Sequence, residues 1–173
     1  SVDGGEWGSE LGDVDSDGDL DLVVGNGDVT LLENNDQGNF TQVDSFGPSY
    51  YQDVLLEDVD SDNDMELVGS LENQANTLYE NDGEGNFSQA DSFGGGSYGM
   101  ALGDVDGDGD LDAAVATGNG VKVYAWSEAD GFSQFTSFGD RPSRDAELAD
   151  VNGDGHLDVV VTNKDAGNAV WTN

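Results

Sequence analysis

The chain has 173 residues, of which 38 are Asp or Glu and only four are Lys or Arg, so its formal net charge at pH 7 is -34. This charge excludes nucleic acids and anionic lipid surfaces as partners, because both require a cationic protein surface. The absence of Cys excludes disulfide bonds and thiolate metal sites. No apolar run is long enough to span a membrane, so membrane insertion is not expected.

The acidic residues concentrate in four nine-residue segments that repeat along the chain. The segments start 45, 46 and 46 residues apart and carry oxygen-bearing side chains at positions 1, 3, 5 and 9. They are residues 13–21, 58–66, 104–112 and 150–158. Such oxygens in a tight turn form a hard anionic cage, which suits calcium. A repeat of this length is too short to bury a core alone, so one domain spanning residues 1–173 is expected.

Each repeat unit contains the same predicted strands in the same order. A short first segment precedes the acidic loop, a Val-rich apolar run typical of a buried strand follows it, and an alternating, half-exposed strand comes next. A fourth strand closes the first three units, after a turn rich in Gly and Asn in the first two. The predicted strands are residues 10–12, 20–24, 29–32 and 40–45, then 54–56, 65–68, 76–79 and 87–92, then 100–102, 111–115, 121–124 and 132–137, and finally 147–149, 157–161 and 168–171.

Four strands per unit, with no helical period, predict an all-β fold and specifically a β-propeller of four blades. The blades correspond approximately to residues 1–45, 46–92, 93–137 and 138–173, and the last blade lacks its outer strand. Three explanations of the missing strand remain open. The last blade has three strands, the chain is one piece of a longer propeller, or a second copy supplies the pairing, because an unpaired strand edge is a template for another chain.

Two sequence signatures together resemble a known family. Asp-x-Asp-x-Asp-Gly-x-x-Asp lies between two predicted strands, and Phe46-Gly47, Phe93-Gly94 and Phe138-Gly139 lie about a dozen residues upstream of the later copies. This combination resembles the FG-GAP/VCBS repeat of integrin-alpha-like, calcium-binding β-propellers. The resemblance implies about four calcium ions, each held by side chains at positions 1, 3, 5 and 9 and by the backbone carbonyl at position 7.

The implied side-chain ligands are Asp13, Asp15, Asp17, Asp21, Asp58, Asp60, Asp62, Glu66, Asp104, Asp106, Asp108, Asp112, Asp150, Asn152, Asp154 and Asp158. The implied carbonyl ligands belong to Asp19, Asp64, Asp110 and His156. In the second loop Asn63 replaces Gly and Glu66 replaces Asp, and in the fourth Asn152 removes a charge. We expect these two loops to bind calcium more weakly than the other two, because ligand charge tunes calcium affinity.

The EF-hand begins with the same acidic pattern but does not fit this chain. It requires a bidentate Glu at position 12 and flanking helices. Position 12 is occupied here by Val24, Gly69, Val115 and Val161, each within a strand-like run.

The charge outside the loops carries a second indication. These acidic residues are scattered with almost no Lys between them. They favour a halophilic protein, because salt near 1 M shortens the Debye length to about 3 Å and screens self-repulsion. The alternative is an acidic secreted protein in calcium-rich water.

Residues that carry catalytic chemistry are scarce. His156 is the only histidine, and it occupies a loop position where the resembling family uses the backbone. The clustered carboxylates are accounted for by metal binding, and no nucleophile elbow, phosphate-binding loop or zinc motif occurs. We therefore expect no enzymatic activity.

A ligand surface is predicted at the start of the first strand of each unit. Side chains six residues before each loop differ from unit to unit, which is typical of a shaped surface, although ordinary packing is the alternative. The residues at and near this position are Trp7, Tyr50, Tyr51, Gln52, Tyr98 and Arg144. Aromatic rings beside acidic groups can hold a sugar or a cationic peptide.

These observations predict a non-catalytic, calcium-binding module for recognition or adhesion, located outside the cell or on a cell or particle surface. Its ligand would be an unidentified protein or carbohydrate. The alternative is a structural subunit of a filament, surface layer or particle that self-associates through the incomplete last blade. A third possibility is an accessory domain of a secreted enzyme.

Overall fold

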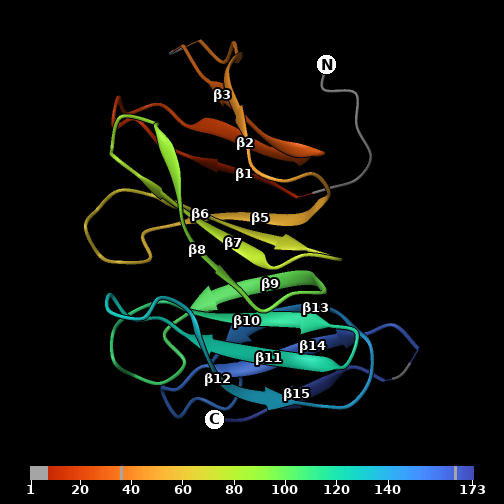
Figure 1. Cartoon of the computed structure of the whole chain (residues 1–173). Coiled ribbons are helices and arrows are strands. Elements are labelled where there is room, and N and C mark those ends of the chain that lie inside the picture. Colours follow the sequence, from red (N-terminus) through yellow and green to blue (C-terminus); the bar gives the residue numbers. More distant parts are fainter. Residues whose placement is uncertain (1–7, 36, 166) are drawn as a thin grey trace.

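The computed structural model describes residues 8–35, 37–165 and 167–173, and the regular structure in these ranges consists of strands without helices. In the described part of the chain, fifteen strands form four antiparallel sheets, and within each sheet neighbouring strands are consecutive in the sequence (Figure 1). The expectation of an all-β fold is therefore confirmed.

The four sheets coincide with the four repeat units. The first contains β1 (Ser9–Gly12), β2 (Asp21–Asn26), β3 (Asp28–Glu33) and β4 (Thr41–Phe46). The second contains β5 (Tyr51–Glu57), β6 (Glu66–Leu71), β7 (Asn76–Asn81) and β8 (Phe87–Phe93). The third contains β9 (Ser97–Gly103), β10 (Asp112–Thr117), β11 (Gly120–Ala125) and β12 (Ser133–Phe138). Within the described ranges the fourth contains β13 (Ser143–Ala149), β14 (Asp158–Asn163) and β15 (Ala169–Trp171).

The sheets pack face to face in chain order, and Figure 1 shows the first and fourth at opposite ends of the row. Extensive strand contacts between sheets link each sheet to the next one in the sequence. We call the face of a sheet that points toward the next sheet its forward face, and the opposite face its rear face. Because the two middle sheets are covered on both faces, every residue of β6 and β10 is buried, as their continuous apolar runs predict.

Three apolar cores lie between successive sheets. In the first, Val14, Val23 and Leu31 on the forward face of the first sheet pack against Leu56, Leu67 and Tyr79 on the rear face of the second. The same arrangement recurs in the next two cores. Each contains an aromatic contact across the junction, and the ring-centroid distances are 4.9 Å for Phe46–Tyr79, 5.1 Å for Phe93–Tyr124 and 5.8 Å for Phe138–Trp171.

Hydrogen bonds also tie neighbouring sheets together near the acidic loops. The Asn81 side-chain amide, at the end of β7, donates to the Val14 carbonyl in the first loop at 2.8 Å. Asn173 donates in the same way to the Val105 carbonyl in the third loop. Each of these two loops is therefore held in part by the sheet that follows it.

Candidate metal centres and ligand cavity

The four acidic loops connect the first two strands of each sheet and share one backbone shape. Positions 4 and 6 both have positive φ in all four loops, which places the carboxylates of positions 1, 3 and 5 in a tight turn. The residues and φ angles at position 4 are Ser16 (61°), Ser61 (64°), Gly107 (84°) and Gly153 (80°), and those at position 6 are Gly18 (95°), Asn63 (78°), Gly109 (102°) and Gly155 (91°). Asn63 thus adopts the left-handed conformation that Gly adopts in the other three loops, which Asn tolerates better than most residues.

Backbone amides hold the loop carboxylates in place. In the second loop, Asp60 accepts a hydrogen bond from the Asp62 amide at 3.3 Å, and Asp58 accepts one from the Asn63 amide at 3.1 Å. Asp62 accepts a third from the Asp64 amide at 2.9 Å. Local side-chain-to-backbone bonds of this kind stabilise turns, so the loop can hold its shape in the absence of helices.

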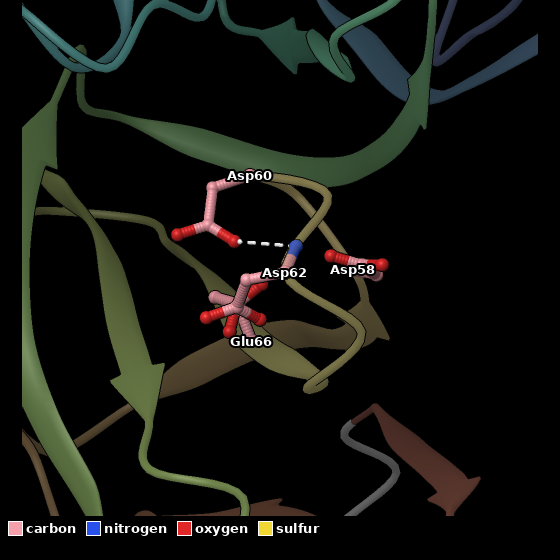
Figure 2. A group of neighbouring side chains, drawn as sticks. All are labelled: Asp58, Asp60, Asp62 and Glu66. Atoms are coloured by element: carbon pink, nitrogen blue, oxygen red, sulfur yellow. Dashed lines mark hydrogen bonds between the residues drawn. The ribbon is translucent and has the colours of Figure 1, made fainter.

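Carboxylates converge most fully in the second loop. Asp58, Asp60, Asp62 and Glu66 each offer one oxygen, and these oxygens lie within 4.8 Å of one another (Figure 2). Three carboxylates converge in the same way in the first and third loops, at positions 1, 3 and 5. These residues are Asp13, Asp15, Asp17, Asp104, Asp106 and Asp108. The predicted ligands at positions 1, 3 and 5 are thus brought together in three loops.

The carboxylates at position 1 of the first and second loops each have an oxygen that supports a bound cation in that loop. Asp13 Oδ1 and Asp58 Oδ1 are buried, and neither has a hydrogen-bond partner. A buried carboxylate oxygen without a partner is costly, because it has lost its water without compensation. A hard cation would satisfy both oxygens, so the residues present fit a calcium ion.

The carboxylate at position 9 has a different primary role. Asp21, Asp112 and Asp158 are at most 1% exposed. Both oxygens of Asp21 accept backbone hydrogen bonds, from the Val14 amide at 3.2 Å and the Asn34 amide at 2.9 Å. Asp112 and Asp158 make the equivalent pairs of bonds. The Asp at position 9 therefore ties its loop to the end of the third strand. Among the described residues at position 9, only the longer Glu66 belongs to a group of convergent carboxylates.

Burial and mutual repulsion perturb the carboxyl groups in the loops. Desolvation, reinforced by the charges of Asp60, Asp62 and Asp58, raises the pKa of Glu66 to about 7. Desolvation also raises the pKa of Asp21 and of Asp112, although backbone hydrogen bonds oppose it. Without metal the first three loops therefore hold negative charge at a free-energy cost.

The fourth loop departs from the others. No group of three convergent His, Cys, Asp or Glu ligands is found there among the described residues. The Asn152 side-chain amide instead donates to Asp154 at 2.9 Å, and Asp150 accepts from the amides of Gly153 and Gly155. His156 is exposed, and its backbone amide donates to Asp154. At the equivalent position 7 of the first and third loops, the amides of Asp19 and Asp110 likewise donate to the carboxylate at position 5.

Three of the six predicted ligand-surface residues meet at one cavity. Gln52, Tyr98 and Arg144 line a cavity of about 310 Å³ formed by β5, β9 and β13. The Arg144 guanidinium lies over the Tyr98 ring, 4.5 Å from its centroid. Each of the three lies where the strand register shifts, so β-bulges release these side chains from the regular alternation.

The other three residues of this predicted surface have different outcomes. Tyr51 is fully buried, and its hydroxyl is 3.1 Å from Thr77 Oγ1. Placing Tyr51 on a ligand surface was therefore wrong, because its ring occupies the space that Gly69 leaves free in the core. Tyr50 is 68% exposed but does not line the cavity. Trp7 lies outside the described residues.

Two acidic residues of the cavity were not singled out from the sequence. Asp53 and Asp145 line it together with Gly99. Desolvation raises the pKa of Asp53 to about 6, with smaller contributions from the charges of Asp145 and Glu10, while amides of Met100 and Val54 oppose the shift. The sequence did contain a signal for these two residues. The position five residues before each loop alternates between Gly and Asp, as Gly8, Asp53, Gly99 and Asp145.

Comparison with known proteins identifies the repeats. The chain matches the FG-GAP-like repeat family over residues 13–69, 58–115 and 104–161. These segments cover most of the sequence, so the chain belongs to the FG-GAP-like repeat family. Repeats of this family form non-enzymatic, adhesion-type modules typical of extracellular or surface proteins, and they often bind calcium.

A comparison with curated proteins finds no match to the chain. The described part of the chain contains no helix with the length and apolar character that a membrane span requires.

Proposed function

We propose that the chain is a non-catalytic, extracellular, calcium-binding β-propeller module that acts in recognition or adhesion. The observation that carries calcium binding is the pair of buried, unpartnered oxygens, Asp13 Oδ1 and Asp58 Oδ1, within convergent carboxylate groups. Family membership and the repeated four-stranded sheets support the propeller arrangement. The high acidic content supports an environment rich in salt or calcium.

Calcium would be held by the carboxylates at positions 1, 3 and 5, assisted by Glu66 in the second loop and by the position 7 carbonyls. When bound, it would supply positive charge that neutralises mutually repelling carboxylates. The position 9 carboxylate already fastens each loop to the strand ends, so a rigid loop would fix the first and third strands of its blade together. Calcium that binds only the folded chain stabilises it by mass action.

The cavity formed by Gln52, Tyr98 and Arg144 is the proposed ligand site. An exposed guanidinium, a half-buried aromatic ring and two carboxylates offer both stacking and charged hydrogen bonds, which suit a carbohydrate or a polar peptide. Its test is binding to glycan and peptide arrays, with Tyr98→Ala expected to abolish any signal that the folded parent gives. The exposed Tyr50→Ala variant is the matched control, and equal loss in both variants would contradict this site.

Native mass spectrometry and melting experiments test calcium binding. A monomer or oligomer that carries three to four calcium ions per chain, with a melting temperature lowered by chelator at fixed ionic strength, is expected. A melting temperature that chelator leaves unchanged would refute a stabilising role for calcium.

The fourth sheet favours a second candidate function, a structural subunit of a filament, surface layer or particle. Within the described residues this sheet has three strands, so the outer edge of β15 is available for pairing with another chain. Substituting Pro for Thr172 or Val170 would remove amide donors at this end of the chain. Association that survives both substitutions would contradict assembly through this edge.

A further inference from the structure

The two ends of the row of sheets expose apolar side chains whose equivalents are buried elsewhere. On the forward face, Val14, Val59 and Val105 are at most 5% exposed, because the following sheet covers each of them. Their equivalent in the fourth sheet, Val151, is 51% exposed. Likewise Val170 on β15 is 53% exposed, although its equivalents in the first three sheets are at most 1% exposed. The fourth sheet therefore presents an uncovered forward face.

The first sheet presents the complementary rear face. Leu11 and Leu20 are 50% and 54% exposed. Their equivalents in the second sheet, Leu56 and Met65, lie directly over Gly12 of the first sheet. In the fourth sheet Leu148 and Leu157 lie in the same way over Gly103 of the third. A pair of large apolar side chains resting on a small residue thus occurs at the first and third junctions between sheets.

The fourth sheet carries a small residue at the place where such a pair would rest. The position that precedes each acidic loop is Gly12 in the first sheet, Glu57 in the second, Gly103 in the third and Ala149 in the fourth. Ala149 is exposed. The exposed Val151 lies two residues further along, in the loop that follows β13, so this end of the sheet offers a small and an apolar side chain to such a pair.

We propose that the rear face of the first sheet docks on the forward face of the fourth sheet of a second copy of this chain. Leu11 and Leu20 of one copy would cover Ala149 and Val151 of the other, repeating the contact that occurs within the chain over Gly12 and over Gly103. A second copy fits because one chain carries both halves of the interface. Such a head-to-tail contact is heterologous, so it either closes into a ring or continues as an open ladder.

A polar contact and the charge of the chain bear on the same interface. Asn34 is the equivalent of Asn81 and Asn173, which donate across sheet junctions to Val14 and Val105. In the docked pair Asn34 would stand opposite the Val151 carbonyl. Two chains of net charge -34 repel each other. Association should therefore strengthen with salt, because screening shortens the range of this repulsion.

Sedimentation velocity over a range of protein concentrations tests the proposal, with calcium present and with NaCl at about 1 M to screen repulsion. The parent chain is expected to form dimers or larger oligomers. The double substitution Leu11→Glu and Leu20→Glu should weaken association by about 100-fold, because each Leu would exchange apolar burial for a desolvated charge. Phe135→Glu is the control, since Phe135 is 56% exposed on β12, away from both end faces.

Mixing complementary variants gives a sharper test. The Leu11→Glu, Leu20→Glu chain keeps its fourth-sheet face, and the Val170→Glu chain keeps its first-sheet face. Each alone should remain monomeric, whereas an equimolar mixture should form a one-to-one heterodimer. Circular dichroism checks that the variants are folded, which is expected because the substituted side chains are already exposed.

Several results would overturn the proposal. These are a parent chain that stays monomeric in high salt, a first-sheet variant that associates as strongly as the Phe135→Glu control, or a mixture that stays monomeric. Association that the first-sheet variant retains, but that Pro substitution in β15 abolishes, would assign assembly to the strand edge and exclude the end-face contact.

Discussion

Replacing Asp58 by Asn should have opposite effects in the absence and in the presence of calcium. Without metal, Asp58 contributes a negative charge to a group that also contains Asp60, Asp62 and Glu66. The introduced side-chain amide is similar in size and can still accept the bond from the Asn63 backbone amide, so the substitution removes charge with little change in packing. With calcium, the same substitution removes a charged ligand.

The distances within the group set the size of the effect. Two charges 4.8 Å apart repel by about 0.9 kcal/mol in water, and by several kcal/mol at an effective dielectric constant of 20. Asp60 and Asp62 are exposed, so the water-like value applies and salt reduces it further. Relief of repulsion from Asp60 and Asp62, with a smaller share from Glu66, whose raised pKa leaves it partly protonated near pH 7, should stabilise the metal-free protein by about 1–2 kcal/mol. This raises the melting temperature by roughly 2–8 °C.

The loss of a charged ligand should weaken calcium binding by at least about tenfold, the lower end of what loss of a supporting residue around a metal typically costs. Each tenfold weakening removes about 1.4 kcal/mol of calcium-dependent stabilisation when calcium is in excess. The advantage of the variant over the parent chain should accordingly disappear or reverse in calcium.

Thermal melting in chelator and in excess calcium, at constant ionic strength, measures both effects. Asp64→Asn is the matched control, because it removes the same charge from the same loop but its carboxylate lies against Gly83 of the neighbouring turn. The control should keep its full response to calcium. An Asp58→Asn protein that is no more stable than the parent in chelator would refute the relief of repulsion. Equal stabilisation of the variant and the parent by calcium would refute the loss of a ligand.

Three further predictions concern other parts of the molecule. Asn81→Ala should lower the free energy of unfolding by about 1–3 kcal/mol in urea titrations, because it leaves the Val14 carbonyl unpaired at a sheet junction. A loss below about 0.5 kcal/mol, the usual range for surface substitutions, would contradict this prediction. Burial raises the pKa of Asp53 from 3.8 to about 6 in the folded protein. Protonated Asp53 therefore favours the folded state, and this stabilisation is fully present below the ordinary pKa and is lost as pH rises through about 6. From pH 4 to 6 the parent should therefore lose stability relative to Asp53→Asn, as measured by paired thermal melts. A stability difference that stays constant over this range would exclude the raised pKa of Asp53. The fourth loop should fill last in a calcium titration followed by amide NMR, with the Gly155 resonance moving after that of Gly109. Simultaneous movement of the two resonances would argue for equal affinities.

Local features of this protein were predictable from sequence. The strands follow from short apolar runs and alternating segments, and each depends mainly on its own residues. The acidic loops are also local, since amides two to five residues away hold their carboxylates. The left-handed conformation of Asn63 is also local, because Asn tolerates it by residue type. The positive φ of Ser16 and Ser61 has no comparable signal in residue type.

The weaker calcium affinity expected for the second loop stays a prediction, but the role of its position 9 residue, Glu66, could not be derived from spacing. Glu66 differs from Asp by one methylene, and that length lets it contact the Val59 amide and still join the carboxylate group. Asp21, at the same position in the first loop, uses both oxygens for backbone bonds, one of them to Asn34 in a separate strand segment. The Asn34 amide is distant from Asp21 in sequence. Whether a position 9 carboxylate uses both oxygens for backbone bonds or joins the carboxylate group therefore depends on the folded sheet.

The sequence alone determined the period, the strand order, the position of the acidic loops and the family, because these reside in residue type and spacing. The tertiary structure decided which side chains face the cavity and which ends remain uncovered. Tyr51 and Gln52 are neighbours in the chain, yet a bulge sends one into the core and the other to the cavity. Val14 and Val151 occupy the same position of the repeat, yet one is 1% and the other 51% exposed. Identical local sequence acquires different surroundings because burial depends on what packs against each sheet, and only the assembled structure supplies that neighbour.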